Sequence, residues 1–298
     1  MPEIPDLEVY VDHFERRLAG QPLRALRIAN PFVLRTATVP PDTFVGRAFQ
    51  RMHRVAKQLV FDFGDHHYLV VHLMISGRFQ WRDEQGAQRK PIPKRLGLLA
   101  LDFDVGTLLM TEASSKKRAS LKLFVGADTL ASIDPGGLEV LTADYPSFAE
   151  RLRATNHTVK RALTDQRVFA GIGNAYSDEI LHRARLSPFK TVAQLSDDEA
   201  ERLFAATVGI LREWTERLTA ENGERFPKKV TAFHDAMAVH GRYKQPCPEC
   251  GAPVQRIQYA ENEANYCARC QTGGKVLADR SLSRLLKDNW PTRIEELE

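Results

Sequence analysis

The stretches Cys247-Pro-Glu-Cys250 and Cys267-Ala-Arg-Cys270 together contain all four cysteines of the chain, with sixteen residues between the two pairs. Two Cys-x-x-Cys turns at this spacing place four thiolates for tetrahedral coordination of Zn²⁺. Because protein ligands would occupy every position around the metal, we expect one structural zinc ion that folds a β-hairpin. A pair of disulfides is the alternative, but nothing in the sequence indicates secretion.

Toward the N-terminus, residues 151–190 form a basic stretch with eight Lys and Arg against three Asp and Glu, whereas the whole chain has a net charge of +4. Such a concentration of positive charge is typical of a surface that contacts a polyanion. Within it, Gly171-Ile-Gly-Asn174 predicts a tight turn, and Ser177-Asp-Glu179 predicts the start of a helix. The pattern indicates either phosphate binding at a helix N-terminus or a helix corner that needs glycines for packing, and locally the two fit equally well.

The residues around this turn read as helical. Ser147 with Glu150, and Ser196 with Glu199, have the spacing of capping boxes, and the second is followed by apolar residues at helical spacing as far as a stop at Gly223.

Residues 1 to about 130 instead read as β-rich after one amphipathic helix over 7–18. Alternating apolar residues at 22–35 and 46–63 predict strands, and two hairpins are expected at 58–75 and 96–113. A sandwich or barrel fits this pattern. The Asp134-Pro-Gly-Gly137 stretch is expected to open the linker to the helical part.

Composition sets the broad class. The chain has 298 residues, of which 43% are hydrophobic and 27% charged, as in globular proteins of two or three domains. No apolar run approaches the ~20 residues that span a membrane, and no signal-peptide pattern opens the chain. We therefore expect a cytoplasmic protein without a membrane partner.

The first eight residues, Met1-Pro-Glu-Ile-Pro-Asp-Leu-Glu8, have two interpretations. They could be an extended tail, as chain termini often are. Alternatively, removal of Met1 would leave Pro2 as a free secondary amine beside Glu3. An α-amino group titrates near pH ~8, so at neutral pH part of it is unprotonated and can attack a carbonyl carbon to form an iminium.

Several motifs occur together along the chain. They are MPEIPDLE at the start, Lys57 in RVAKQLVF, HLMISG at 72–77, DQRVFAGIGNAYSDEIL at 165–181, and HGRYKQPCPECG before the second Cys-x-x-Cys. Together they resemble the formamidopyrimidine-DNA glycosylase / endonuclease VIII family of base-excision enzymes. The resemblance covers about residues 1 to 270, with its elements in the family's order.

The resemblance implies an α+β multidomain fold with an N-terminal β-sandwich, a helix-two-turn-helix domain and a C-terminal zinc-finger β-hairpin. The expected ranges are 1–131 for the catalytic domain with its leading helix, 132–240 for the helix-two-turn-helix domain, 241–275 for the zinc finger and 276–298 for a C-terminal extension.

The resemblance also implies roles for residues and partners. Pro2 would be the nucleophile at C1′ of the damaged nucleotide, Glu3 the acid/base that assists sugar-ring opening, and Lys57 a phosphate contact and proton donor. The product imine would then undergo β- and δ-elimination at an abasic site. The expected partner is damaged double-stranded DNA, bound by a monomer associated with a bacterial nucleoid. The expected DNA contacts are His72, Met74, Ile75, Lys116, Lys117, Arg118, Lys160, Gly171, Gly173, Asn174 and Tyr176.

The chain departs from the family's pattern at several places. Asp6 stands where the family usually has Glu, and HLMISG offers Met74 one place early with Ile75 at the aligned place. The loop 114–120 keeps positive charge but lacks the family's aromatic wedge. Asn262 stands where an arginine is expected at the hairpin tip, so the tip should contribute less to DNA binding. Residues 277–290 read as a short amphipathic helix beyond the usual end.

Two functions from different classes remain open. In the first, the chain is a DNA glycosylase and abasic-site lyase; in the second, it is a damaged- or abasic-DNA-binding protein of the same fold with weak or altered glycosylase activity. Pro2, Glu3 and Lys57 favour the enzyme, whereas the altered loop and hairpin tip favour the binding protein.

Overall fold

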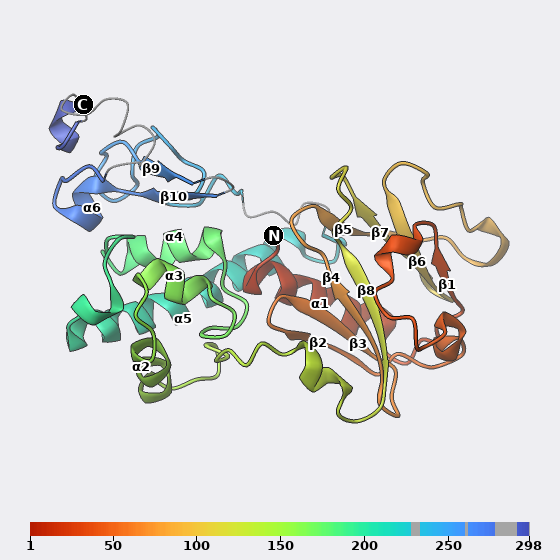
Figure 1. Cartoon of the computed structure of the whole chain (residues 1–298). Helices are drawn as coiled ribbons and strands as arrows, with labels where there is room; N and C mark the ends of the chain where they lie inside the picture. Colours follow the sequence, from red (N-terminus) through yellow and green to blue (C-terminus); the bar gives the residue numbers. More distant parts are fainter. Residues whose placement is uncertain (228–232, 260–261, 278–290, 298) are drawn as a thin grey trace. The chain divides into compact units, whose positions relative to one another are not determined.

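The computed structural model describes residues 1–227, 233–259, 262–277 and 291–297 (Figure 1). The fold divides into two compact units, one of residues 1–135 and 215–231, the other of residues 136–214 and 232–298. The four predicted domain ranges stay a prediction, and the structure groups residues 215–231 with the N-terminal part. No helix in the described ranges has the length and apolar character needed to cross a membrane.

The first unit contains two four-stranded antiparallel sheets, with strand orders β1-β6-β7-β5 and β2-β3-β4-β8. Both predicted hairpins are confirmed, as β3–β4 and β6–β7. Short 3₁₀ turns connect the strands. The elements are β1 (Ala25–Ile28), η1 (Pro31–Val33), η2 (Pro41–Phe44), β2 (Arg51–Val55), β3 (Gln58–Asp62), β4 (His67–His72), β5 (Gly77–Arg82), η3 (Gly86–Gln88), β6 (Gly97–Phe103), β7 (Gly106–Glu112), β8 (Ser120–Val125) and η4 (Thr129–Ile133).

One aromatic cluster joins both sheets to the leading helix α1 (Ile4–Leu18). The ring of Phe14 lies 5.2 Å from Phe61 of β3 and 5.3 Å from Phe79 of β5, measured between centroids. Phe61 and Phe79 themselves are 6.1 Å apart, so the two sheets meet face to face over the helix. This is the predicted β-sandwich with its leading helix. The helix begins at Ile4 rather than at residue 7 because Glu3 and Asp6 cap it.

The second unit begins with helices α2 (Tyr145–Arg153), α3 (Val159–Thr164) and α4 (Asn174–Arg183), and then has the turn η5 (Val192–Gln194) and the long helix α5 (Asp197–Asn222), whose last turns belong to the first unit. The predicted capping box of Ser196 and Glu199 is confirmed by two reciprocal hydrogen bonds of 3.0 and 3.2 Å.

Two predicted helix starts in this unit are wrong. Helix α2 begins at Tyr145, not near Ser147, because the Asp144 carboxylate accepts the Ser147 N–H and is the cap. Helix α4 begins at Asn174 rather than at Ser177, with Gly173 as its N-cap. The pair Asp178 and Glu179 therefore lies inside the helix instead of at its exposed first turn.

The hairpin β9 (Gln255–Gln258) and β10 (Glu263–Tyr266) follows, with the short helix α6 (Ala268–Thr272) and the turn η7 (Ile294–Glu296). The predicted helix over 277–290 lies almost entirely in 278–290, outside the described residues. Residue Ile294 is fully buried in the core of the finger, and the Val276 N–H donates to Thr292 O over 2.9 Å. The described end of the chain therefore completes the core of the zinc-finger hairpin.

The aromatic cluster generates a stability prediction. Phe14→Ala should lower the free energy of unfolding of the first unit by about 3–5 kcal/mol, because it leaves a cavity where helix and both sheets meet. Phe32→Ala is the matched control, since its ring is 74% exposed, and should change stability by less than about 0.5 kcal/mol. Denaturant titration followed by tryptophan fluorescence measures both; equal effects would show that the cluster is not central.

Candidate functional site

The N-terminus is buried rather than frayed. Pro2 is buried, and Glu3 and Asp6 are only 3% and 2% exposed. The Glu3 N–H donates to Asp6 Oδ2 over 2.9 Å, and the Glu3 carboxylate accepts the N–H of Asp6 in return. This reciprocal capping box fixes the first residues of the chain at the start of α1.

Charged groups distant in sequence converge on this terminus. Burial lowers the pKa of the Met1 α-amine below its usual value, the charge of Glu3 opposes this shift, and Arg78 adds to it. The pKa of Lys57, in the turn between β2 and β3, is also lowered by burial and raised in part by Glu3. The Met1 amine, Glu3 and Lys57 thus share one electrostatic neighbourhood, next to Pro2. A lowered pKa favours the unprotonated form of an amine.

Asp6, which departs from the family's glutamate, is strongly affected by this environment. Burial raises its pKa to about 7, while the hydrogen bond from the Glu3 N–H opposes the rise. A carboxyl group with such a pKa exchanges its proton near neutral pH. The first helical turn therefore holds a titratable group directly beside Glu3.

His72 ends β4 and opens the turn to β5. Burial and, to a lesser extent, the charge of Lys57 lower the pKa of His72 to about 4, so the ring is neutral at physiological pH. Its Nδ1 accepts the Met74 N–H over 3.0 Å. The Gly77 N–H closes the turn on Leu73 O over 2.8 Å, and a Cβ added at Gly77 would lie 2.2 Å from that oxygen. Ile75 is 64% exposed on this turn, whereas Met74 is half-buried.

The basic loop 114–120 is anchored by Glu112, which is 2% exposed at the end of β7. The Glu112 carboxylate accepts the N–H groups of Arg118 and Ala119 over 3.0 and 3.1 Å, and the Lys117 ammonium donates to the Glu112 carbonyl. Lys116 and Arg118 are exposed. Of the three predicted cations, Lys117 therefore supports the loop, and the other two face solvent.

Lys160 in α3 is engaged with the protein rather than exposed. Its ammonium donates to Asp178 Oδ1 at 2.5 Å, Ser177 Oγ at 2.9 Å and Asn174 O at 3.3 Å. Its side chain is 12% exposed and that of Asp178 is fully buried. The three donors of the ammonium are thus used inside the protein, which places Lys160 beside the predicted phosphate turn as a support for it.

The turn before α4 is held by Gln166, which the sequence analysis missed. Its side chain accepts the Gly171 N–H over 2.9 Å and donates to Ile172 O over 2.8 Å. Gly171 has a φ of 80°, a left-handed conformation that favours glycine. The only sequence signal was an amide side chain five residues before the first glycine.

Tyr176 is buried. Its ring is 1% exposed and packs edge-on against Trp214 at 6.0 Å between centroids, so its side chain belongs to the core, and its contact with DNA stays a prediction. Asn174 lies at the start of α4, where its Nδ2 donates to Glu263 O of the hairpin over 2.8 Å. Gly173, the N-cap, lies beside it.

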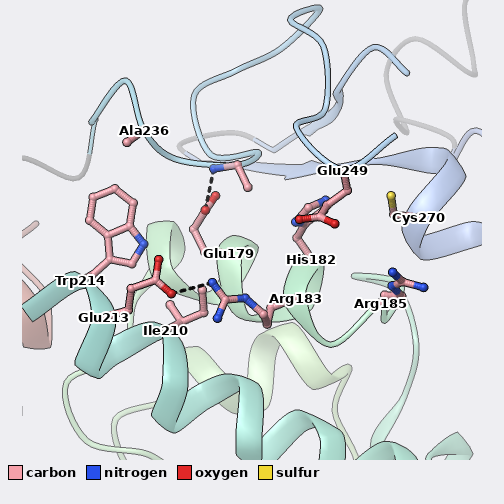
Figure 2. A pocket seen from close by; sticks show the side chains of 11 residues that line it. Glu179, His182, Arg183, Arg185, Ile210, Glu213, Trp214, Ala236, Glu249 and Cys270 are labelled. Atoms are coloured by element: carbon pink, nitrogen blue, oxygen red, sulfur yellow. Dashed lines mark hydrogen bonds and ion pairs between the residues drawn. The ribbon is translucent and has the colours of Figure 1, made fainter. Parts of the chain in front are cut away.

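Two buried carboxylates of α4, also missed, join the helices to the zinc finger. Asp178 Oδ2 lies 2.8 Å from His240 Nδ1 and accepts the Asn265 N–H over 3.1 Å. The Glu179 carboxylate accepts the N–H groups of residues 238, 239 and 240 over 2.7–2.9 Å. Figure 2 shows Glu179 reaching across a pocket of about 240 Å³, whose wall also holds an ion pair between Arg183 and Glu213 at 2.8 Å.

The four cysteines meet as predicted. Their sulfur atoms all lie within 4.8 Å of one another, with Cys247 and Cys270 at 3.9 Å and Cys250 and Cys267 at 3.4 Å. Tetrahedral zinc with Zn–S bonds of ~2.3 Å separates its sulfurs by roughly 3.8 Å, so the cluster fits this metal. His182 Nε2 lies 3.3 Å from Cys247 Sγ, a hydrogen bond that orients the thiolate and was not predicted.

Comparison with known families matches three stretches of the chain. The formamidopyrimidine-DNA glycosylase N-terminal domain matches residues 1–114, the formamidopyrimidine-DNA glycosylase H2TH domain matches 137–221, and the zinc finger found in FPG and IleRS matches 244–273. With four cysteines brought together in the matched finger, the protein has one structural zinc site.

Individual relatives agree. A formamidopyrimidine-DNA glycosylase from Desulforamulus reducens is 31% identical over 282 residues, 91% of this chain and 99% of the relative. An uncharacterized formamidopyrimidine-DNA glycosylase-like protein from Mycobacterium tuberculosis is 40% identical over 156 residues, 52% of this chain and 95% of the relative. The crystal structure of a Lactococcus lactis FPG mutant with Fapy-dG-containing DNA has a TM-score of 0.78 and 25% identity, covering 91% of this chain and 100% of that one.

The raised pKa of Asp6 predicts a pH dependence of stability. Unfolding returns the pKa from about 7 to 3.8, so between these values the folded protein binds more protons, and its stability falls as the pH rises. Asp6→Asn resembles the protonated acid and should melt like the wild type near pH 4 but at least about 3 °C higher at pH 8. The exposed Asp128→Asn is the control; a difference that does not vary with pH would contradict the assignment.

Removal of one zinc ligand should unfold the finger selectively. Cys250→Ser should abolish stoichiometric zinc, measured by elemental analysis of protein purified without chelator, because binding of the metal supplies the folding free energy of such hairpins. The first unit should keep its unfolding transition. A wild-type protein that contains no zinc would overturn the prediction.

Proposed function

Since the chain belongs to the formamidopyrimidine-DNA glycosylase family, we propose that it excises a damaged base from DNA and cleaves the abasic site through an imine on Pro2. The observation that carries the proposal is the convergence of buried Pro2, Glu3 and Lys57 at the chain terminus, where burial lowers the pKa of the Met1 amine; removal of Met1 would place the free amine on Pro2. Base-excision repair in a bacterial cell is the matching role, with the protein acting as a monomer on damaged double-stranded DNA.

The proposed reaction uses the residues in sequence. With Met1 removed, the Pro2 nitrogen attacks C1′ of the damaged nucleotide, and the base leaves with the electrons of the glycosidic bond. Glu3 takes the proton that the Pro2 nitrogen loses and passes it to the ring oxygen as the sugar opens, which yields an iminium between Pro2 and C1′. The departing base takes its proton from the Lys57 ammonium. Loss of the acidified C2′ proton then expels the 3′ phosphate, and a second elimination expels the 5′ phosphate.

Lys57 and Asp6 have supporting roles in this proposal. The lowered pKa of Lys57 makes its ammonium a better proton donor than an exposed lysine, while its charge suits a nearby phosphate. Asp6 holds Glu3 through the reciprocal capping bonds and exchanges its own proton near neutral pH. Together they keep Glu3 positioned at the nucleophile.

DNA binding would use groups from each unit. In the first unit these are the partly buried His72, the exposed Ile75 as the apolar side chain that enters the gap left by the extruded base, and the solvent-facing cations Lys116 and Arg118. In the second, Gly171, Gly173 and Asn174 present the phosphate turn, which Lys160 braces. Extruding a nucleotide costs a few kcal/mol, so contacts on both sides of the lesion are needed.

Borohydride trapping on duplexes with different damaged bases tests the proposal. The wild type should form a covalent adduct with at least one lesion, whereas an uncleaved N-terminal tag should abolish the adduct by blocking the amine. Pro2→Gly should reduce it, since a primary amine replaces the secondary one. Full trapping by the tagged protein would refute the role of Pro2.

Glu3→Gln provides the matched variant. The amide can still accept the backbone N–H that caps α1, so DNA binding should persist, but it cannot transfer a proton, and base excision should fall by about 10²–10⁴-fold. If the wild type instead shifts damaged or abasic DNA in gels without any adduct across the whole panel, the protein is a damage-binding member of the family with lost excision.

A further inference from the structure

A groove of about 820 Å³ lies in the second unit beside helix α3, the start of α4 and the β9–β10 hairpin. Its size falls within the ~300–1,000 Å³ of ordinary ligand sites. Its lining includes Lys160, Arg161, Asn174, Phe189 and Tyr259, and none of the described lining residues is acidic. The groove is therefore suited to an anionic ligand that also has apolar faces.

Two aromatic rings border this groove and are unusually exposed. Phe189 is 39% exposed and Tyr259 is 50% exposed. Phe189 sits on a turn closed by the Lys190 N–H on Ser187 O at 3.0 Å, and Tyr259 sits where the hairpin turns, its N–H donating to Asn262 O at 2.7 Å. Phe189 is thus presented by a hydrogen-bonded turn, and Tyr259 by the backbone-bonded end of strand β9.

Charge in the groove comes from Arg161. The ammonium of Lys160 is neutralised by Asp178, and the amide of Asn174 is bonded to Glu263 O. Arg161 is exposed, and within the described ranges its guanidinium has no ion pair or hydrogen bond with another side chain. The groove thus offers one available cation and two aromatic rings among its described lining residues.

We propose that this groove binds unpaired nucleotides of DNA, with Phe189 and Tyr259 stacked on bases and Arg161 at a phosphate. The faces of a paired base are covered by its neighbours in the duplex, so exposed rings gain stacking only from bases that have left the helix. Stacking on the aromatic rings would then provide DNA affinity at the hairpin, where the neutral Asn262 cannot bind a phosphate as a cation would. The proposal rests on the proposed function only in taking DNA as the ligand.

Binding of a fluorescein-labelled oligonucleotide with a tetrahydrofuran abasic analogue tests the groove, as a single strand and as a fully paired duplex. Phe189→Leu and Tyr259→Leu keep apolar bulk but lose the ring, and each should raise the Kd for the single strand about fivefold or more, with less than about a twofold change for the duplex. Tyr259→Phe should bind like the wild type. Phe32→Leu, an exposed aromatic outside the groove, is the control.

Salt dependence tests the cation separately. Arg161→Gln should flatten the slope of log K against log salt for the single strand by about 0.7, the value for one phosphate contact. Leucine variants that melt like the wild type and bind the single strand with unchanged Kd would overturn the proposal. An unchanged salt slope for Arg161→Gln would show that Arg161 does not contact a phosphate.

Borohydride trapping on a paired lesion separates this proposal from the enzymatic one. If the wild type is trapped on the paired lesion and the leucine variants bind the single strand as the wild type does, the groove proposal is refuted and the enzymatic proposal stands. Absence of trapping in the wild type, together with ring-dependent binding of the single strand, refutes the proposed activity and leaves the groove standing.

Discussion

Two adjacent carboxylates inside helix α4 are the constraint on which the second unit depends. Asp178 and Glu179 are 1% and 2% exposed, and a carboxylate removed from water is costly unless charges or donors compensate it. Their partners come from α3, from residues 238–240 and from β10, which lie far apart in the chain. Satisfying one pair of acids therefore holds the glycine turn, the segment before the finger and the hairpin against a single helix.

Compensation of buried carboxylates by hydrogen-bond donors also determines the structure at the start of the chain. Termini usually remain in water, yet here burial of Glu3 and Asp6 is compensated by reciprocal backbone bonds at the helix start. Burial then shifts the pKa of the Met1 amine, Asp6 and Lys57 in the direction of the uncharged form. The electrostatic environment of this terminus is thus a consequence of packing, and the capping bonds fix where Glu3 and Asp6 lie within it.

Local sequence patterns correctly predicted the elements whose formation depends on neighbouring residues. Both hairpins of the sandwich, the Ser196 cap and the cysteine cluster depend on residues within a few positions or on fixed spacing, and all are confirmed. The patterns were insufficient in two situations: where two neighbouring residues could both cap a helix, and where the partners of a residue lie far along the chain. Ser147 and Asp144 are equally good caps by composition, and nothing near Tyr176 shows that Trp214 will cover its ring. Likewise, Lys160 reads as a surface cation until the buried acid that neutralises it is known.

The turn after β4 restricts how this protein can change. A Cβ at Gly77 would meet the backbone oxygen of Leu73 rather than a movable side chain, and the same oxygen already closes the turn. A side chain at position 77 is therefore excluded unless the backbone itself moves. Ile75, which is 64% exposed on the same turn, can change without disturbing this contact. Replacing Ile75 by shorter or longer aliphatic residues would change the reach of this one side chain stepwise, while the backbone of the turn stays in place.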